Sequence, residues 1–278
     1  MKYISILIFL ALALIAGTTI AQSTLGSITD DEGDLYAQTK QVNQFFRRFN
    51  NEEDLKGNRS YPGDSDYRTA ENRKLYLNIL FDEQSTIMTK KLKKEFIEKV
   101  NNTDSPVFLD FHGDLWFSEL AVNFLQDDNK ESLMLFLQLE KENLGYKWAI
   151  TNVYYDKFLK YFYKGDKETI KKSFLHPMSH ELDFMNIRKT FKDPAYVEYY
   201  AGKDYKPDYR TLLFYEIKKG NMKYESVGIL KFHFFQVDGW YFEVSFFNRP
   251  GGNSGWLISK LYKLTETEKD ELIQFYLP

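Results

Sequence analysis

Apolar and polar residues alternate strictly over the last third of the chain, between Gly228 and Tyr262. Because successive side chains of a strand point to opposite faces, this pattern predicts three consecutive strands whose apolar residues share one face. The tight-turn sequence Asp238-Gly239 separates the first two strands. The shared face is aromatic, so it either packs against the rest of the domain or lines a cavity. Its residues are Leu230, Phe232 and Phe234, then Trp240, Phe242, Val244 and Phe246, then Trp256 and Ile258.

In the first half of the chain, apolar residues recur at helical spacing and then change to a period of two. This order predicts three helices followed by an antiparallel meander. The expected helices cover residues 35–49, 69–83 (with Thr69 as N-cap and Leu75, Ile79 and Leu80 facing inward) and 89–100, and the expected strands cover residues 107–111, 117–125, 132–140 and 146–155.

The second half repeats this plan more loosely. Expected helices cover residues 157–174, a segment that begins at Ser179 and carries Phe184, Ile187 and Phe191 on one face, and residues 266–275; expected strands cover residues 211–218, 224–236, 239–247 and 255–264. Both halves end on a Trp-x-Ile strand, at Trp148 and at Trp256. An internal duplication explains this match, and the alternative is that amphipathic edge strands converge on the same pattern.

Three helices followed by a meander that closes on the Lys-Trp-x-Ile strand at Lys147 resemble the NTF2-like fold, a cone of curved sheet wrapped around helices. The likeness covers residues 35–155 well and residues 165–264 weakly. It implies an α+β fold with helices packed on curved antiparallel meander sheets, as two NTF2-like units in tandem at residues 35–155 and 156–278. The superfamily contains isomerases, dehydratases and binding or assembly modules, including exported bacterial proteins, so the resemblance does not choose a function.

The N-terminus has the three parts of a secretory signal peptide: a positive Lys2, the apolar run Ile6–Ala16, and small residues up to Ala21. We predict removal of residues 1–21 and a flexible lead-in over residues 22–34. The apolar run is short for a membrane anchor of about 20 residues, which is the alternative. No cysteine follows it, so a lipoprotein is excluded. We expect export to the periplasm or the medium, without a membrane span after signal removal.

Composition narrows the classes of chemistry. The chain has 278 residues, 43% of them apolar and 17% aromatic, which suits a globular protein of about two domains. It has no cysteine, which excludes disulfides, thiolate zinc sites, iron–sulfur clusters and cysteine nucleophiles. Both signs of charge are interspersed and the net formal charge is −3. No basic face of the kind that binds nucleic acid is present.

Asp110, His112 and Asp114 form an acid–histidine–acid set. In NTF2-like enzymes, Asp and His inside the cone carry out general acid–base catalysis, so the resemblance makes this set a catalytic candidate. However, pointing Asp110 and His112 inward would turn Leu109 and Phe111 outward. Gly113 also marks a turn, in which Asp and His are ordinary residues. We therefore expect a turn here and no catalytic residues.

Two further motifs suggest ligands. His176 and His180 have the spacing of metal ligands on a helix, but Pro177 disfavours a helix at His176, so we predict no metal site and no cofactor. The loop from Arg249 to Gly255 resembles a phosphate-binding loop, but a strand follows it where a helix N-terminus is needed. We expect a hairpin loop there whose flexibility serves recognition.

The candidate ligand-pocket residues are His233, Trp240, Phe242 and Trp256. We favour a core position for the aromatic face, with an open pocket as the alternative. For His233, a half-exposed position on the sheet is the more common one, and a position in the pocket wall is the alternative. We predict an exported, non-catalytic binding or assembly module for a protein or small-ligand partner. One alternative is an enzyme or ligand carrier that uses an NTF2-like cone as its pocket. Another is an accessory protein of an envelope or conjugation machine.

Overall fold

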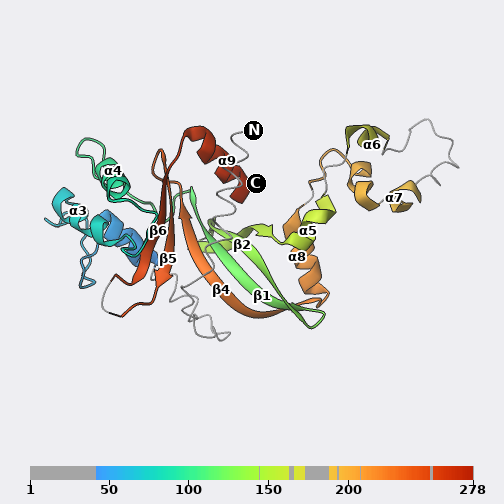
Figure 1. Ribbon diagram of the computed structural model, residues 1–278, viewed down its shortest axis with the longest axis horizontal. Helices are drawn as coiled ribbons and strands as arrows, with labels where there is room; N and C mark the ends of the chain where they lie inside the picture. Colours follow the sequence, from blue (N-terminus) through green and yellow to red (C-terminus); the bar gives the residue numbers. More distant parts are fainter. Residues whose placement is uncertain are drawn as a thin grey trace.

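A computed structural model of the chain describes residues 42–143, 145–162, 166–172, 188–192, 194–206, 208–250 and 253–277. Within these residues the protein is α+β, and its strands form one open six-stranded antiparallel sheet in the order β3-β2-β1-β4-β5-β6 (Figure 1). The strands are β1 (Trp116–Gln126), β2 (Asn129–Glu142), β3 (Gly145–Tyr154), β4 (Met222–Phe234), β5 (Trp240–Phe247) and β6 (Gly255–Lys263).

The sheet joins the two halves of the chain. β1 pairs with β4 from Trp116, opposite Phe234, to Gln126, opposite Met222. The prediction of two tandem NTF2-like units is therefore wrong, because the two meanders share one sheet. The reason is physical: alternation along a strand fixes which residues face the core, but it does not fix which strand is the neighbour. The predicted boundary after Tyr155 falls in the connection between β3 and the next helix.

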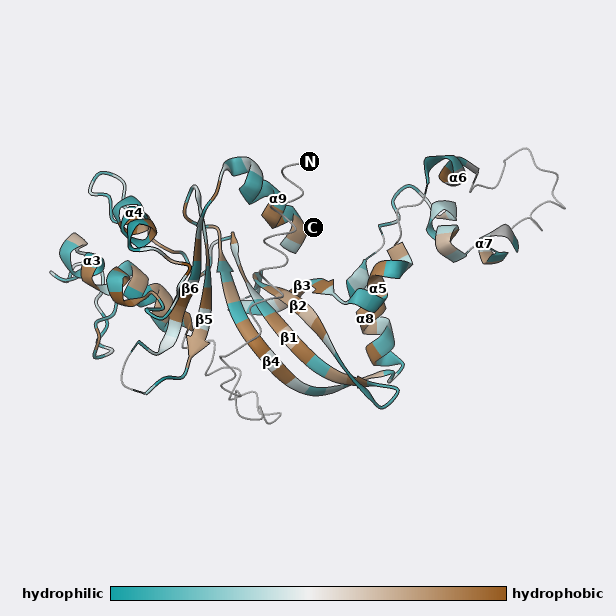
Figure 2. Ribbon diagram, in the orientation of Figure 1, coloured by the Kyte–Doolittle hydropathy of each residue, from teal (hydrophilic) through white to brown (hydrophobic). Residues whose placement is uncertain are grey.

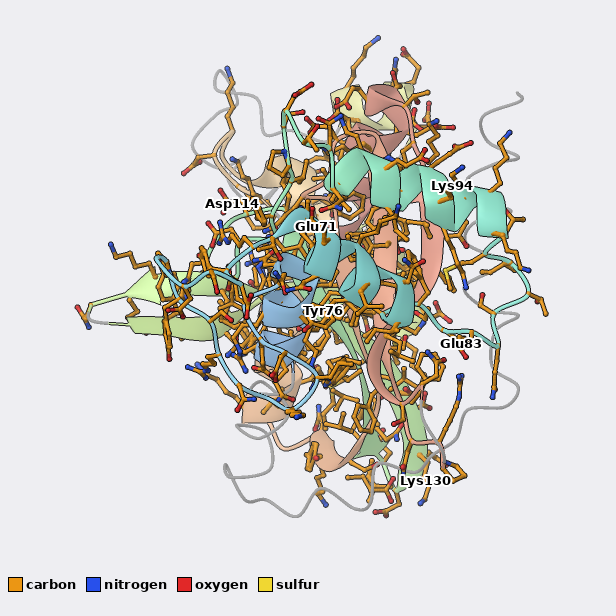
Figure 3. All side chains as sticks on the ribbon, turned by 90° about the vertical axis from the view of Figure 1, so that its left-hand side faces the viewer. Glu71, Tyr76, Glu83, Lys94, Asp114 and Lys130 are labelled. Atoms are coloured by element: carbon orange, nitrogen blue, oxygen red, sulfur yellow. The ribbon has the colours of Figure 1, made fainter. Side chains whose placement is uncertain are left out.

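Three helices cover one face of the sheet near β4, β5 and β6: a helix of residues 42–50, α3 (Ala70–Ile79) and α4 (Lys90–Val100). Figure 3 views this side, with Glu71 and Tyr76 on α3 and Lys94 on α4 in front of the sheet. α4 begins where the pattern predicts, with the Thr89 side chain accepting a hydrogen bond from the backbone N–H of Leu92.

Aromatic rings fill the space between these helices and the sheet. Phe234 and Phe242 stack at 4.7 Å between ring centroids, and Phe242 also lies parallel to Phe49 of the first helix at 6.1 Å. The predicted aromatic face is therefore core over most of its area. The core between the helices and the sheet contains buried residues from both, including Val42, Phe45, Phe46, Phe49, Phe96, Val100, Trp116, Phe232, Phe234, Trp240, Phe242, Val244 and Ile258.

α3 turns a different face inward from the one predicted. Leu75 and Ile79 are 58% and 37% exposed, so their predicted inward position is wrong, whereas Leu80 is buried as predicted. Leu77 and Arg73 are buried in place of Leu75 and Ile79. The Arg73 guanidinium donates hydrogen bonds to the backbone carbonyls of Phe49, Val100 and Val107. A hydrophobic-periodicity argument places arginine outside, and so it selects the wrong face of the helix.

Residues 107–111 do not form the predicted strand. The side chain of Asn50 takes the place of a neighbouring strand: its amide oxygen accepts from the Leu109 N–H at 2.8 Å, and its NH₂ group donates to the Leu109 carbonyl at 2.8 Å. Arg73 binds the Val107 carbonyl in the same way. The segment is extended and apolar, as its sequence indicates, but side chains satisfy its backbone.

The other end of the sheet is covered by α5 (Asp156–Leu159) and α8 (Tyr209–Lys218), which lie on the right in Figure 1. The strand predicted at residues 211–218 is therefore wrong. Asp208 caps α8 by accepting from the Arg210 N–H at 2.8 Å, and helical spacing brings Tyr209 and Leu213 to one side. The apolar run of this segment suits either structure, and the preceding cap decides in favour of a helix.

The helix predicted at residues 157–174 is broken into α5, the 3-10 turn η1 (Lys160–Phe162) and α6 (Lys167–Lys172). α7 (Lys189–Lys192) and the 3-10 segment η3 (Pro194–Tyr200) follow before α8. Phe191 is 81% exposed, so it does not face inward in the described residues. The helix start predicted at Ser179, with Phe184 and Ile187, lies outside the described residues, as do the predicted signal peptide and lead-in.

α9 (Glu266–Tyr276) packs on the opposite face of the sheet from α3 and α4 (Figure 1). It begins with a capping box, in which Thr265 and Glu268 exchange hydrogen bonds. Figure 2 shows hydrophobic and hydrophilic residues along β1 and β4, and apolar residues of β1 pack on both faces, Trp116 on the side of α4 and Phe117 on the side of α9. Among the described residues, no helix combines the length and the apolar character needed to cross a bilayer.

Candidate functional site

A pocket of about 610 Å³ opens between the first helix, the end of α3 and the connection from β5 to β6. It lies on the face of the sheet that the N-terminal helices cover, where their contact with β5 and β6 ends. Aromatic and aliphatic side chains form part of the lining, and polar groups form the rest. The residues are Phe45, Ile79, Leu80, Phe246, Trp256, Leu257 and Pro250, with Gln44, Arg48, Glu83, Gln84, Arg249, Asn253, Ser254 and Gly255.

The end of α3 is held against the outer edge of β6. The Ile258 N–H donates to the Leu80 carbonyl at 2.7 Å, and the Asp82 N–H donates to the Ile258 carbonyl at 3.0 Å. This short parallel pairing covers part of an edge strand. It also sets the distance between the α3 side of the pocket and the β6 side.

Asn253 fastens the β5–β6 connection to the same segment. Its side-chain NH₂ donates to the Phe81 carbonyl at 2.8 Å, and its amide oxygen accepts from the Glu83 N–H at 2.9 Å. The backbone of Asn253 has φ 45°, a conformation that Asn tolerates better than most residues. Arg249 adds an ion pair with Asp82 at 2.7 Å. The rim of the pocket is therefore cross-linked by contacts between residues about 170 positions apart.

Arg48 contributes a cation to the lining with little compensation. Its Nε lies 3.8 Å from Oε1 of Glu53 and makes no hydrogen bond to any described residue. The Glu53 carboxylate is bound more closely by Arg47, at 2.6 Å. Two guanidinium groups thus share one buried carboxylate, which leaves a local excess of positive charge beside the pocket.

Trp256, a predicted pocket residue, lies in the pocket wall and is 8% exposed. Its ring contacts Phe246 at 5.4 Å and Phe232 at 4.9 Å, so it is shared between the wall and the core. The indole N–H has no hydrogen-bond partner among the described residues. The other two aromatic candidates, Trp240 and Phe242, are buried in the core and do not line the pocket.

His233 lies on the opposite face of the sheet from this pocket. It is fully buried, so the predicted half-exposed position is wrong. Its Nδ1 lies 2.8 Å from the Tyr241 hydroxyl, and its Nε2 lies 2.9 Å from Oε2 of Glu119 but outside hydrogen-bond alignment. The ring stacks on Phe117 at 4.7 Å, and Tyr276 of α9 covers it at 5.1 Å. Burial raises the pKa of Tyr241 well above 10.

His233 belongs to a buried charge network that the sequence analysis did not find. Glu243 binds Lys260 at 2.7 Å and Lys231 at 3.6 Å, and Lys231 lies 3.8 Å from Glu119. Burial alone would raise the pKa of Glu119, but contact with His233 and the charges of the two lysines lower it from 4.5 to about 2. Lys231, His233 and Glu243 occupy the alternate positions between the apolar core residues of β4 and β5. The alternation in the sequence therefore already indicated that these charged residues share the other face of the sheet. Cross-strand charge pairs of this kind stabilise the sheet beneath α9.

Asp110, His112 and Asp114 form the expected turn, and all three are exposed. Asp110 accepts from the backbone N–H of His112 at 2.9 Å, and the Gln236 side chain ties the turn to β4 through the carbonyls of Asp110 and Asp114. His112 stacks on Tyr146 at 4.2 Å. The three side chains do not converge on a cavity in the described structure.

Two motifs from the sequence remain, the pair of His176 and His180 and the loop that begins at Arg249. His176 and His180 lie outside the described residues. The described residues themselves contain no group of three or more His, Asp or Glu side chains that could hold a metal ion. The connection that begins at Arg249 leads into the strand β6, as expected of a hairpin loop, and not into a helix N-terminus.

Comparison of the chain with known proteins finds no matching protein-family model, curated protein or solved structure. The resemblance to the NTF2-like superfamily therefore stays a prediction.

Proposed function

We propose that the protein is a non-catalytic binding module and that the pocket beside Trp256 holds a small ligand. The observation that carries this proposal is the pocket itself, with a volume of about 610 Å³ and a mixed aromatic and polar lining. This volume lies within the range of small-molecule sites, about 300–1,000 Å³, while the lining is more polar than the mainly apolar wall of most such sites, which favours a ligand that carries polar groups. This proposal combines two hypotheses from the sequence, the binding module and the ligand carrier. It places the ligand in this pocket and not in an NTF2-like cone.

The fixed rim supports a binding role. Asn253, Arg249 and Ile258 tie the β6 side of the pocket to the α3 side through hydrogen bonds and an ion pair. A ligand that enters a preformed site loses less free energy to ordering of the protein. The apolar wall offers burial of ligand surface, worth about 25 cal/mol per Å².

The experiment uses a neutral fluorescent probe, N-phenyl-1-naphthylamine, titrated into the full chain. Ile79 lies at the pocket, whereas Leu75 lies one turn earlier on α3 and does not line it. We expect Ile79→Trp to fill part of the pocket and weaken probe binding by about tenfold or more, since one lost contact worth 1.4 kcal/mol is tenfold. Leu75→Trp is the matched control, with the same added ring on the same helix.

Probe binding that is absent in the wild type, or equally strong in both variants, would contradict the proposal. Circular dichroism and cooperative melting of each variant establish that the fold is intact.

A further inference from the structure

We propose that the natural ligand of this pocket is an amphipathic anion, with its carboxylate-like or sulfonate-like head group bound by Arg48 and its apolar body against Phe246 and Trp256. The inference rests on the proposed function and names the chemical class of the ligand. It begins from the balance of charge in the lining.

Among the described residues, three ionisable ones line the pocket: Arg48, Glu83 and Arg249. Arg249 is compensated within the protein, by its 2.7 Å ion pair with Asp82. Glu83 is an exposed residue, and its backbone N–H is bound to Asn253. Solvent therefore screens the Glu83 carboxylate. In the part of the chain that the structure describes, Arg48 therefore remains as the cation that a ligand can reach from the pocket.

Arg48 lacks a close anionic partner among the described residues. Its neighbour Glu53 is engaged at 2.6 Å by Arg47, and the contact between Arg48 and Glu53 is long, at 3.8 Å. The Arg48 side chain is two-thirds removed from water, with 33% of its surface exposed. A guanidinium group in this setting gains from a charged acceptor, and its planar fork suits a carboxylate or sulfonate.

The first helix places the charged and apolar parts of the site together. Phe45 and Arg48 are three residues apart, so they project from the same side of the helix, and both line the pocket. Phe246 and Trp256, 5.4 Å apart, form the facing wall from β5 and β6. A ligand whose head reaches Arg48 therefore lays its body along aromatic rings.

The test compares two probes that share a ring system: the neutral N-phenyl-1-naphthylamine and the anionic 1-anilinonaphthalene-8-sulfonate. In the wild type we expect the anion to bind about tenfold more tightly than the neutral probe, because a charge-assisted hydrogen bond to Arg48 increases the affinity by about this factor. In Arg48→Gln this preference falls to about unity, while the affinity for the neutral probe changes less than twofold. Arg48→Lys keeps part of the preference because it keeps the charge.

Arg59→Gln is the charge-matched control, since Arg59 is exposed and does not line the pocket. It should retain the preference for the anion. If the neutral probe fails to bind the wild type, the proposed function itself fails. If the neutral probe binds but the anion gains no advantage, or if Arg48→Gln and Arg59→Gln behave alike, the pocket stands and this inference is overturned.

Discussion

Replacing Arg73 by methionine tests whether a buried arginine, rather than an apolar side chain, holds the helical layer together. Arg73 is fully buried and connects three segments through the carbonyls of Phe49, Val100 and Val107. Methionine keeps much of the volume and the helix propensity but offers no donor. The substitution therefore isolates the hydrogen bonds from the packing.

The expected loss follows from the three carbonyls. A buried acceptor left without its partner costs about 1–3 kcal/mol, and the effects of neighbours are not additive. We expect Arg73→Met to lower the free energy of unfolding by at least about 3 kcal/mol. That is a large share of the 5–15 kcal/mol typical of a folded domain. Lysine, with a single ammonium group, can reach fewer of the carbonyls, so Arg73→Lys should lie between methionine and the wild type.

The assay is urea unfolding followed by circular dichroism, which gives the midpoint and the slope. Lys74→Met, at the next position on α3, is the control, because Lys74 is exposed and should change stability by less than about 0.5 kcal/mol. The reasoning is refuted if Arg73→Met and Lys74→Met unfold at the same urea concentration. It is also refuted if Arg73→Lys is less stable than Arg73→Met.

Three further predictions follow from the sheet. Because the pKa of Glu119 is lowered from 4.5 to about 2, its stabilisation is complete above pH 4.5 and is lost as the pH falls towards 2. This is of the order of 3 kcal/mol, and unfolding midpoints of Glu119→Gln should depend less on pH across that window than those of the wild type. A chain that ends at Tyr155 lacks β4 and should show no cooperative melting; a sharp transition would mean that the first half is autonomous. Trp240→Ala should cost about 3–5 kcal/mol in chemical denaturation because Trp240 is core, and an unchanged midpoint would argue against this position.

The sequence pattern predicted much of the local structure. β4, β5 and β6 lie close to the expected segments, and α4 and α9 begin directly after Thr89 and Thr265, two hydroxyl residues that act as N-caps. The α8 error was avoidable, since Asp208 is a strong cap residue directly before the segment. The strand pairing was not accessible in this way, because alternation is blind to the identity of the neighbouring strand.

The pocket was predicted in part. Trp256, which lines the pocket, was a candidate pocket residue because it belongs to the predicted aromatic face of the last three strands. Arg48 was not, because it lies at the edge of the apolar stripe of the helix of residues 42–50, beside Phe45, where arginine is an ordinary residue. Its relation to the β5–β6 connection depends on contacts such as that between Glu83 and Asn253, which are distant in sequence. Periodicity describes one element at a time, so it cannot reveal a site assembled from several.

The pairing of β1 with β4 also bears on the order in which the chain can fold. Asn123 on β1 contacts Ser226 on β4, which is 103 positions later in the chain, and the β1–β4 ladder lies in the middle of the sheet. Such distant pairing costs loop-closure entropy and slows folding. Until β4 is available, β1 presents an open strand edge with apolar residues, which favours association with other chains. Rapid access to the C-terminal strands should therefore limit how long the newly made chain is prone to aggregate.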